Sequence, residues 1–396
     1  MHNTLIQIYN ISTMNLCAIP RRLGSSLTAV LGVACVVGVF VSVLSMATGF
    51  QRTMASAGSP DTVIFIRAGA LTEMSSGLSF EQTQLVAQLP GIARRDNQPL
   101  TSAELFVVAD LAKKTSNLAA NVSLRGVQPA AFTVRDKVKI IAGRNFEPGK
   151  NELIVGRSAQ QQFANLEIGN KIKLGQSQWQ VVGIFAAEGG LPESEIWCDA
   201  KILQGIYRRG NRFQTIRAKI DGPDSVAQLR AAIAADPQMI VDVRLETEYL
   251  AEQSEPLSKF IKLVGYPLAI IMALGAIFAA INTMYTSVSA RTREIATLRA
   301  LGFGPLPVAA SILLESLVLA LAGGVIGSIV VYCVFNGYTV STLNFASFSQ
   351  VVFDFAVTPS LVIQGVVMAI VIGIIGGLFP AYRAVNMPVA AALRDL

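Results

Sequence analysis

The sequence predicts a polytopic α-helical membrane protein with four transmembrane helices and a large extramembrane α/β plus β-rich domain between helices 1 and 2. Of its 396 residues, 52% are hydrophobic and only 15% are charged, and the mean hydropathy is +0.50, so the chain is more apolar than an ordinary soluble domain. Four apolar stretches are long enough to cross a bilayer, which takes about 20 residues. The long polar segment 51–262 separates the first two of these stretches.

The four predicted spans lie in stretches with few charged residues. Arg22 and Arg52 bracket the first stretch, and Glu315 is the only charged residue inside the third. The predicted spans are 27–49, 264–287, 307–335 and 359–380. The first is longer than the apolar region of a cleaved signal peptide, so we interpret it as a retained anchor that follows a cytoplasmic amphipathic N-terminal helix at 1–26.

Positive charges predict the orientation, because short loops rich in Lys and Arg stay on the cytoplasmic side of a membrane. The arginines next to the spans lie on one side: Arg21, Arg22, Arg291, Arg293, Arg299, Arg383 and Arg394. The loop 336–358 on the other side contains neither Lys nor Arg. We therefore expect both termini, the tail 381–396 and the connection 289–305 to be cytoplasmic, with 51–262 on the opposite side.

The segment 51–262 is long enough to bury a core of its own. Alternating apolar and polar residues predict strands at 62–69, 104–111, 121–127, 171–175, 179–185, 213–220 and 241–246. Helical patterns at 79–89 and 224–236 lie toward its two ends. We therefore expect an α/β subdomain made of 51–103 and 198–248, a strand-only, β-rich insert at 104–197, and a stalk helix at 248–262 that leads into the second span.

The composition argues against enzyme chemistry. His2 is the only histidine and the four cysteines show no CxxC spacing, so His-based catalysis, a thiolate metal site and a disulfide framework are not expected. The stretch GRNFEPGKN approaches a phosphate-binding loop, but five residues separate Gly143 from Gly149 where the motif has four, and no Ser or Thr follows Lys150. The net charge of +6 comes without a basic stripe interleaved with aromatic residues, so no nucleic acid is expected. No catalytic residue, cofactor or metal is predicted in this chain.

The connection between the second and third spans has an unusual composition, SARTREIATLRALGFGP. Ile295, Leu298 and Leu301 form an apolar arc at helical spacing, which leaves Arg291, Glu294 and Arg299 to face outward, and Gly302 is expected to end the helix. The pattern predicts a short amphipathic helix over 291–301 at the cytoplasmic surface. A positively charged loop with an ordinary interfacial helix is the alternative.

The order of these residues is informative, because REIATLRALGF (293–303) resembles the coupling-helix segment of MacB/FtsX-like ABC transporter permeases. The stretch 21–39 is similar to the first span of that family, 143–185 to its periplasmic domain, and 376–396 to its closing segment. One departure is that no nucleotide-binding domain precedes the first span. The departure implies a separate ATPase subunit, which would hold ATP and Mg²⁺.

The resemblance implies the permease subunit of an ABC exporter in a bacterial inner membrane, with the large α/β plus β-rich domain in the periplasm. Two permeases, either two copies of this chain or two paralogues, would pair with two ATPase subunits and work by mechanotransmission. A periplasmic adaptor and an outer-membrane channel would complete a tripartite efflux system. Two alternatives stay open: a LolC/LolE-like permease that extracts lipoproteins or lipids, and an FtsX-like regulator of a periplasmic hydrolase.

The expected contact with the ATPase consists of Arg291, Arg293, Glu294, Ile295, Leu298 and Arg299. Glu294 is the expected central polar contact, because a carboxylate is favoured near a helix N-terminus and accepts charge-assisted hydrogen bonds. Ile295 and Leu298 would fill an apolar groove on the ATPase. The three arginines would divide between the partner and anionic lipid head groups.

Two intramembrane features complete the predicted sites. A charge in a span is costly, so Glu315 either takes part in hydrogen bonding that locks helix packing or has a role in the conformational cycle. The pairs Gly323 with Gly327 and Gly373 with Gly377 have the spacing that allows close helix approach in lipid. They predict packing within the helix bundle or between protomers.

Overall fold

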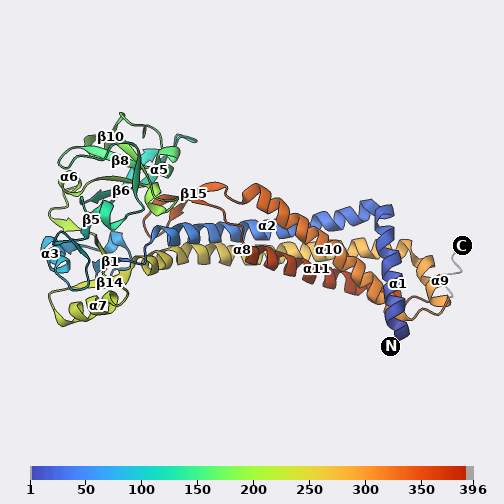
Figure 1. Cartoon of the computed structure of the whole chain (residues 1–396). Helices are drawn as coiled ribbons and strands as arrows, with labels where there is room; N and C mark the ends of the chain where they lie inside the picture. The colour runs from blue at the N-terminus through green and yellow to red at the C-terminus, as the bar shows by residue number, and fades with distance from the viewer. Residues whose placement is uncertain (1, 389–396) are drawn as a thin grey trace. The chain divides into compact units, whose positions relative to one another are not determined.

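The computed structural model describes residues 2–388, which fold into two compact units (Figure 1). The membrane unit comprises 1–48, 260–338 and 355–396, and the extramembrane unit comprises 49–259 and 339–354. Arg394, with the rest of the predicted tail beyond residue 388, lies outside the described residues, as do the side chains of Arg21 and Arg22. The chain passes between the units four times, so neither unit is a continuous segment.

Four helices of the described chain are long and apolar enough to cross a membrane. They are α2 (Leu23–Ala57), α8 (Glu246–Ala290), α10 (Pro305–Phe335) and α11 (Pro359–Val385). The predicted stalk at 248–262 and the second span at 264–287 form one unbroken helix, α8. At a rise of 1.5 Å per residue, α8 is about 68 Å long, roughly twice the hydrocarbon thickness of a bilayer. Two shorter elements, α1 (His2–Ala18) and the 3₁₀ turn η1 (Ile19–Arg22), precede α2.

The predicted glycine pairs lie where helices of the membrane unit touch each other. A Cβ atom on Gly323 would come within 2.6 Å of the Val30 carbonyl oxygen of α2, and one on Gly327 within 2.4 Å of the Ala34 carbonyl oxygen. A Cβ atom on Gly373 would likewise come within 2.7 Å of Ala320 Cβ of α10, and one on Gly377 within 2.7 Å of Ser316 Cβ. Since lipid provides no hydrophobic drive between helices, such close backbone approach is a main source of their association.

Most strands of the extramembrane unit form one ten-stranded sheet, in the order β14-β1-β13-β5-β6-β11-β8-β10-β7, with β9 paired to β10. These strands are β1 (Thr62–Arg67), β5 (Thr101–Ala112), β6 (Ala119–Val127), β7 (Lys139–Gly143), β8 (Glu152–Gly156), β9 (Lys171–Leu174), β10 (Ser177–Ala186), β11 (Glu195–Asp199), β13 (Thr215–Lys219) and β14 (Val241–Leu245). Short pairs are formed by β2 (Leu78–Ser79) with β12 (Arg212–Phe213) and by β3 (Arg94–Arg95) with β4 (Gln98–Pro99). The helical segments are η2 (Glu73–Ser75), α3 (Phe80–Ala87), α4 (Ala131–Val134), α5 (Arg157–Gln162), η3 (Leu191–Ser194), α6 (Ala200–Ile206) and α7 (Ser225–Ala235).

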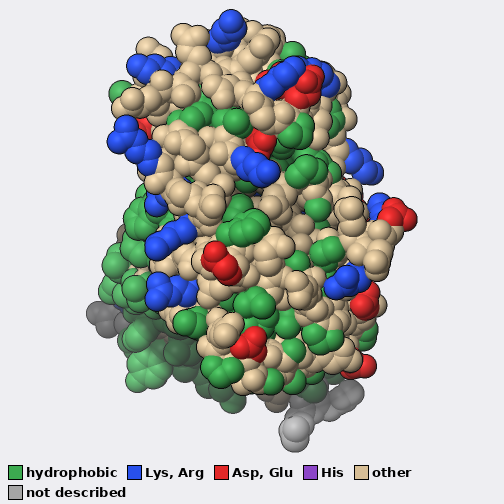
Figure 2. All heavy atoms as spheres, turned by 90° about the vertical axis from the view of Figure 1, so that its left-hand side faces the viewer, with side chains coloured by type: hydrophobic (Ala, Val, Ile, Leu, Met, Phe, Trp, Pro, Cys, Tyr) green, Lys and Arg blue, Asp and Glu red, His purple; other side chains and the backbone are tan. Residues whose placement is uncertain are grey.

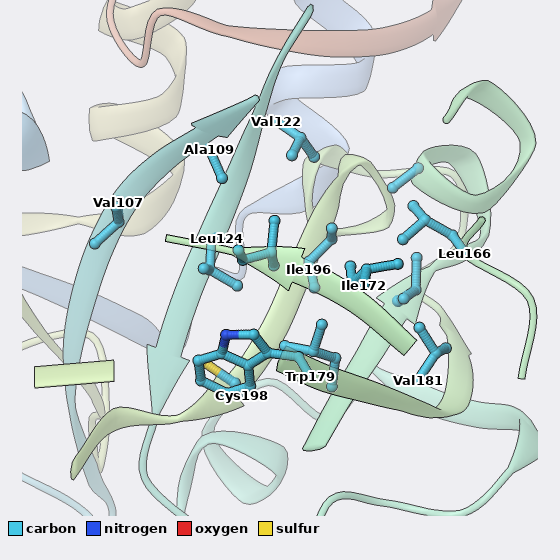
Figure 3. Packing of buried hydrophobic residues seen from close by; sticks show 14 of the residues in the cluster. Val107, Ala109, Val122, Leu124, Leu166, Ile172, Trp179, Val181, Ile196 and Cys198 are labelled. Atoms are coloured by element: carbon cyan, nitrogen blue, oxygen red, sulfur yellow. The ribbon is translucent and has the colours of Figure 1, made fainter. Parts of the chain in front are cut away.

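Two large hydrophobic clusters pack against this sheet, beside a smaller one that contains Phe185 and Trp197. One gathers residues from both ends of the segment, including Val63, Ile216 and Leu229. The other belongs to the middle, where side chains of β5, β6, β10 and β11 converge around the buried Trp179 (Figure 3). The expectation of a strand-only insert is wrong, because α4 and α5 lie within it.

A hairpin between α10 and α11 belongs to the extramembrane unit. It consists of β15 (Thr339–Asn344) and β16 (Ser349–Asp354), and the sequence had indicated only a loop at 336–358. Ser123 of β6 donates to the Ser349 hydroxyl at 2.7 Å, and the Val352 N–H donates to Ser194 Oγ at 3.0 Å. The side-chain amide of Asn121 donates to the Phe348 carbonyl at 2.7 Å. These contacts connect the hairpin to β6 and η3.

A cluster of buried charges joins the sheet to the start of α8. Each of its members is at most 7% exposed: Glu73, Glu104, Glu195, Glu246, Arg125, Arg135 and Arg217. Arg125 donates to both Glu195 oxygens at 2.9 and 2.8 Å, and its Nη1 reaches Glu73 at 2.7 Å. Arg217 bridges Glu73, at 2.6 Å, and Glu246. Buried charges need this many partners because desolvation otherwise outweighs their attraction.

Glu246, the first residue of α8, has a second contact. Its carboxylate accepts the Ser59 N–H at 3.2 Å, just beyond the end of α2. One turn further along α8, the Tyr249 hydroxyl accepts the Glu73 N–H at 3.0 Å. The end of α2, the start of α8 and the sheet therefore meet at one carboxylate.

The cluster predicts loss of stability in acid. Burial alone would raise the pKa of Glu73, but Arg125 and Arg217 more than offset it and lower the pKa from its ordinary 4.5 to about 2. A carboxyl with a pKa lower in the folded than in the unfolded chain stabilises the fold at higher pH. This contribution is lost as the pH falls from about 4.5 toward about 2.

Trp197 can report this loss, because its indole N–H donates to Glu195 in the same cluster at 2.7 Å. In the detergent-solubilised Trp179→Phe chain, we expect Trp197 fluorescence to show urea unfolding at progressively lower urea as the pH falls over that range. A Glu73→Gln variant should be less stable near neutral pH and should depend less on pH. An equal acid dependence in both proteins would contradict the role assigned to Glu73.

Candidate functional site

A short helix, α9 (Thr292–Ala300), connects α8 to α10. Gly302 follows it with φ +96°, a left-handed conformation that glycine adopts without steric cost and that commonly ends helices. Pro305 then begins α10, where its missing N–H and fixed φ suit the first helical position. The chain therefore turns on both sides of α9, and α9 lies at this end of the helix bundle (Figure 1).

The residue before α9 forms a buried ion pair with α10. Arg291 Nη1 donates to Glu315 Oε2 at 3.0 Å and Nη2 donates to Oε1 at 3.4 Å. Both residues are almost fully buried, at 4% and 3% exposed. The two parallel hydrogen bonds give the pair a fixed geometry as well as charge compensation, so they hold the N-terminal end of α9 against α10.

The apolar side of α9 is also occupied by the chain itself. Ile295 is 7% exposed and packs with Val308 and Ile312 of α10, while Leu298 is half-buried beside the same cluster. The expectation that Arg291 faces outward is wrong, and so is the expectation that Ile295 fills a groove on a partner. Local periodicity identified an apolar face but not which protein it would pack against.

Arg299 is half-buried at the other end of α9. Its Nη1 donates to the carbonyl oxygens of Val385, at 2.9 Å, and Met387, at 2.7 Å. Carbonyls at the C-terminal end of a helix lack intrahelical donors, and a cation satisfies them well. Arg299 therefore connects α9 to the end of α11, in place of the partner or lipid contact that the sequence suggested.

Arg293, Glu294 and Thr297 form the exposed side of α9. Next to this side lies a groove of about 620 Å³ between α9 and α1. It is lined by Met14, Asn15, Cys17, Ala18, Glu294, Thr297 and Leu298. The groove, together with the exposed Arg293, offers a surface of mixed polarity that a second protein can contact.

Sequence reasoning missed the contribution of α1. The Asn15 amide donates to the Ser311 hydroxyl at 3.0 Å, which fixes α1 on α10 and creates the second wall of the groove. Within the described residues, no group of three or more His, Cys, Asp or Glu side chains is placed to hold a metal ion.

Comparison with protein families explains this combination of helices and sheet. Residues 26–236, more than half of the chain, match the MacB-like periplasmic core domain, and 267–389 match the FtsX-like permease C-terminal domain. The chain belongs to the MacB/FtsX-like ABC permease family. It is accordingly a multi-pass membrane permease whose extramembrane unit is periplasmic.

Individual relatives of this permease are distant. The chain is 27% identical over 237 residues to the macrolide export ATP-binding/permease protein MacB of Hyphomonas neptunium, covering 57% of this chain and 35% of that protein. It is 23% identical to the lipoprotein-releasing system transmembrane protein LolC of Xylella fastidiosa, over 93% of each chain. The crystal structure of the periplasmic region of MacB from Actinobacillus actinomycetemcomitans aligns with a TM-score of 0.37 and 13% identity, over 52% of this chain and 94% of that one. The permease thus spans about a third of the length of the first MacB relatives that it matches.

The buried pair predicts a non-additive mutational response. Arg291→Met or Glu315→Met alone leaves one buried charge without its partner, which typically costs about 3–5 kcal/mol. The double Arg291→Met, Glu315→Met variant removes both charges and should be clearly more stable than either single variant. Thermal unfolding of the wild type and the three variants, each purified in the same detergent, measures their order of stability. A double variant with the summed loss of the two single variants would show that the pair is not coupled.

Proposed function

We propose that this permease is the transmembrane subunit of an exporter in which a separate ABC ATPase, carrying ATP and Mg²⁺, docks at α9. ATP-driven movement of that subunit would be passed to the periplasmic domain by mechanotransmission. The match to the LolC relative over 93% of both chains supports a permease that works with a separate ATPase.

The observation that carries the proposal is the exposed side of α9 next to the α1 groove. Glu294 is exposed near the N-terminus of α9 and lines the groove together with Thr297 and Leu298. A carboxylate there can accept charge-assisted hydrogen bonds from Arg or Lys of the ATPase. We place Glu294 at the centre of the contact, with Arg293 toward the ATPase or anionic lipid head groups.

The contacts of α9 explain how a push on it would be transmitted. Arg291 connects α9 to α10 through Glu315, and Arg299 connects it to the carbonyls at the end of α11. A movement of α9 would therefore act on two spans at once. The helix before it, α8, is continuous as far as Glu246, which belongs to the buried charge cluster of the periplasmic domain.

The remaining partners follow from the exporter proposal. Four spans are few for a transport path, so a second permease, identical or paralogous, would complete the transmembrane part. A periplasmic adaptor and an outer-membrane channel would extend it into a tripartite efflux system. The membrane would be the bacterial inner membrane, with both termini in the cytoplasm.

Lipoprotein release is a second candidate function. The LolC relative, a transmembrane protein of a lipoprotein-releasing system by name, matches along nearly its entire length, whereas the first MacB relative matches over 35%. Co-purification from crosslinked cells distinguishes the two functions, because recovery of an adaptor favours tripartite export and recovery of acylated proteins favours release.

The coupling role of α9 predicts that Glu294→Lys releases the ATPase. Reversing a paired interface charge typically costs at least 2 kcal/mol, or about 30-fold in affinity. Co-purification of the ATPase with the tagged permease measures the effect. The control is Glu255→Lys, the same charge change at an exposed residue of the periplasmic domain. If Glu294→Lys retained the ATPase as well as this control does, α9 would not be the coupling contact.

The proposed orientation predicts which cysteines a membrane-impermeant maleimide reaches in spheroplasts. In a Cys35→Ala, Cys333→Ala background, exposed Cys17 of α1 should react only after permeabilisation. A Lys150→Cys substitution at an exposed periplasmic residue should react without it. Cys198 is buried and serves as the unreactive internal control. Labelling of Cys17 in intact spheroplasts would overturn the cytoplasmic placement of the N-terminus.

A further inference from the structure

The periplasmic domain contains a large open groove that the coupling site does not explain. It measures about 1140 Å³ and lies where the two hydrophobic clusters meet. The helix α6 separates the clusters, since its Ala200 packs in one and its Leu203 in the other. Ligand sites occur preferentially at such junctions. The residues that line the groove include Phe80, Pro99, Gln128, Lys201, Gln204 and Arg208.

The accessible charge of the groove is positive. The segment 200–212 contains Lys201, Arg208, Arg209 and Arg212 but no Asp or Glu. All four cations are exposed, and none is in an ion pair with another described residue. Lys and Arg side chains are also more widespread than acidic ones on the face of the domain seen in Figure 2. Lys201 and Arg208, the two of these cations that line the groove, are therefore available to an acidic ligand.

The one carboxylate in the groove wall does not offset them. Asp199 is 8% exposed, and its two oxygens accept the N–H groups of Gly149, at 2.7 Å, and Lys201, at 2.8 Å. It serves as the N-cap of α6 and holds the neighbouring loop. Both of its oxygens are thus hydrogen-bonded to backbone N–H groups.

Uncharged polar groups in the groove wall can form hydrogen bonds with a polypeptide backbone. Gln128 Oε1 accepts the Ala103 N–H at 3.0 Å, and Gln204 Nε2 donates to the Arg212 carbonyl at 2.9 Å. Gln128 Nε2 and Gln204 Oε1 have no partner among the described residues, so the groove presents both a donor and an acceptor. Phe80, which is 46% exposed, and Pro99 add apolar surface. The volume exceeds the roughly 300–1000 Å³ typical of small-molecule pockets.

We propose that this groove binds an acidic, extended segment of a periplasmic protein. Carboxylates of the segment would face Lys201 and Arg208, and its backbone would pair with Gln128 and Gln204. The inference names a partner for the proposed exporter and in that respect rests on the proposed function. Binding itself requires no ATPase, so the two proposals can fail separately.

The test uses the full-length permease in lipid nanodiscs and a fluorescent Glu-rich peptide, with a Lys-rich peptide of equal length for comparison. We expect saturable binding of the Glu-rich peptide only, weakened by salt because exposed charges are screened. A Lys201→Glu, Arg208→Glu variant should bind at least about 10-fold more weakly, or about 1.4 kcal/mol. A Lys201→Arg, Arg208→Lys variant keeps both charges and should bind nearly as the wild type does.

The matched control is Lys171→Glu, Lys173→Glu, which makes the same change in net charge at two exposed residues of β9 outside the groove. It should bind the peptide within about 2-fold of the wild-type affinity. Equal losses in both charge-reversed variants, no binding, or displacement of the peptide by inorganic phosphate or anionic vesicles would each overturn the proposal. If the Glu294→Lys variant kept the ATPase while the groove still bound the peptide specifically, only the proposed function would be contradicted.

Discussion

Charge removed from water must be matched by opposite charge close by, and both units of this permease are arranged around that constraint. In the membrane unit, Glu315 is paired with Arg291, so the one carboxylate of the third span also fixes α9. In the periplasmic domain, Arg125 and Arg217 are surrounded by carboxylates from η2, β11 and α8. Each pair connects elements that apolar packing alone would leave free to slide, because hydrophobic contact has no preferred direction.

Much of the fold could be predicted because bilayers and sheets impose simple periodicities. The four spans followed from long apolar runs with few charges, and strands such as β5 and β10 from alternation. Strands β8 and β11 were missed, since every residue in both is buried and no alternation remains. The stalk helix and the second span were predicted as adjoining segments, because the stalk is polar and the span is apolar, and the structure joins them in α8.

The candidate site was predictable in position but not in orientation. The helix over 291–301 and its bounding Gly302 were correctly placed, because capping and amphipathic spacing are local properties. The inward direction of Arg291 depends on Glu315, 24 residues away, and on how α8 and α10 pack. Likewise the groove beside Glu294 exists only because α1 returns to α10, a contact that no local pattern encodes.

The hairpin β15–β16 has a consequence for biosynthesis. Its partners Ser123 and Ser194 emerge from the ribosome long before Ser349 and Val352, with two further spans made in between. Chains fold from the N-terminus during synthesis, so the sheet of 49–259 forms while the hairpin strands are still untranslated. The hairpin can dock only after α10 has been inserted and the chain has been carried back across the bilayer. The hydrogen bonds between the hairpin and the serines of β6 and η3 therefore form last. If the third span were inserted wrongly, these hydrogen bonds could not form.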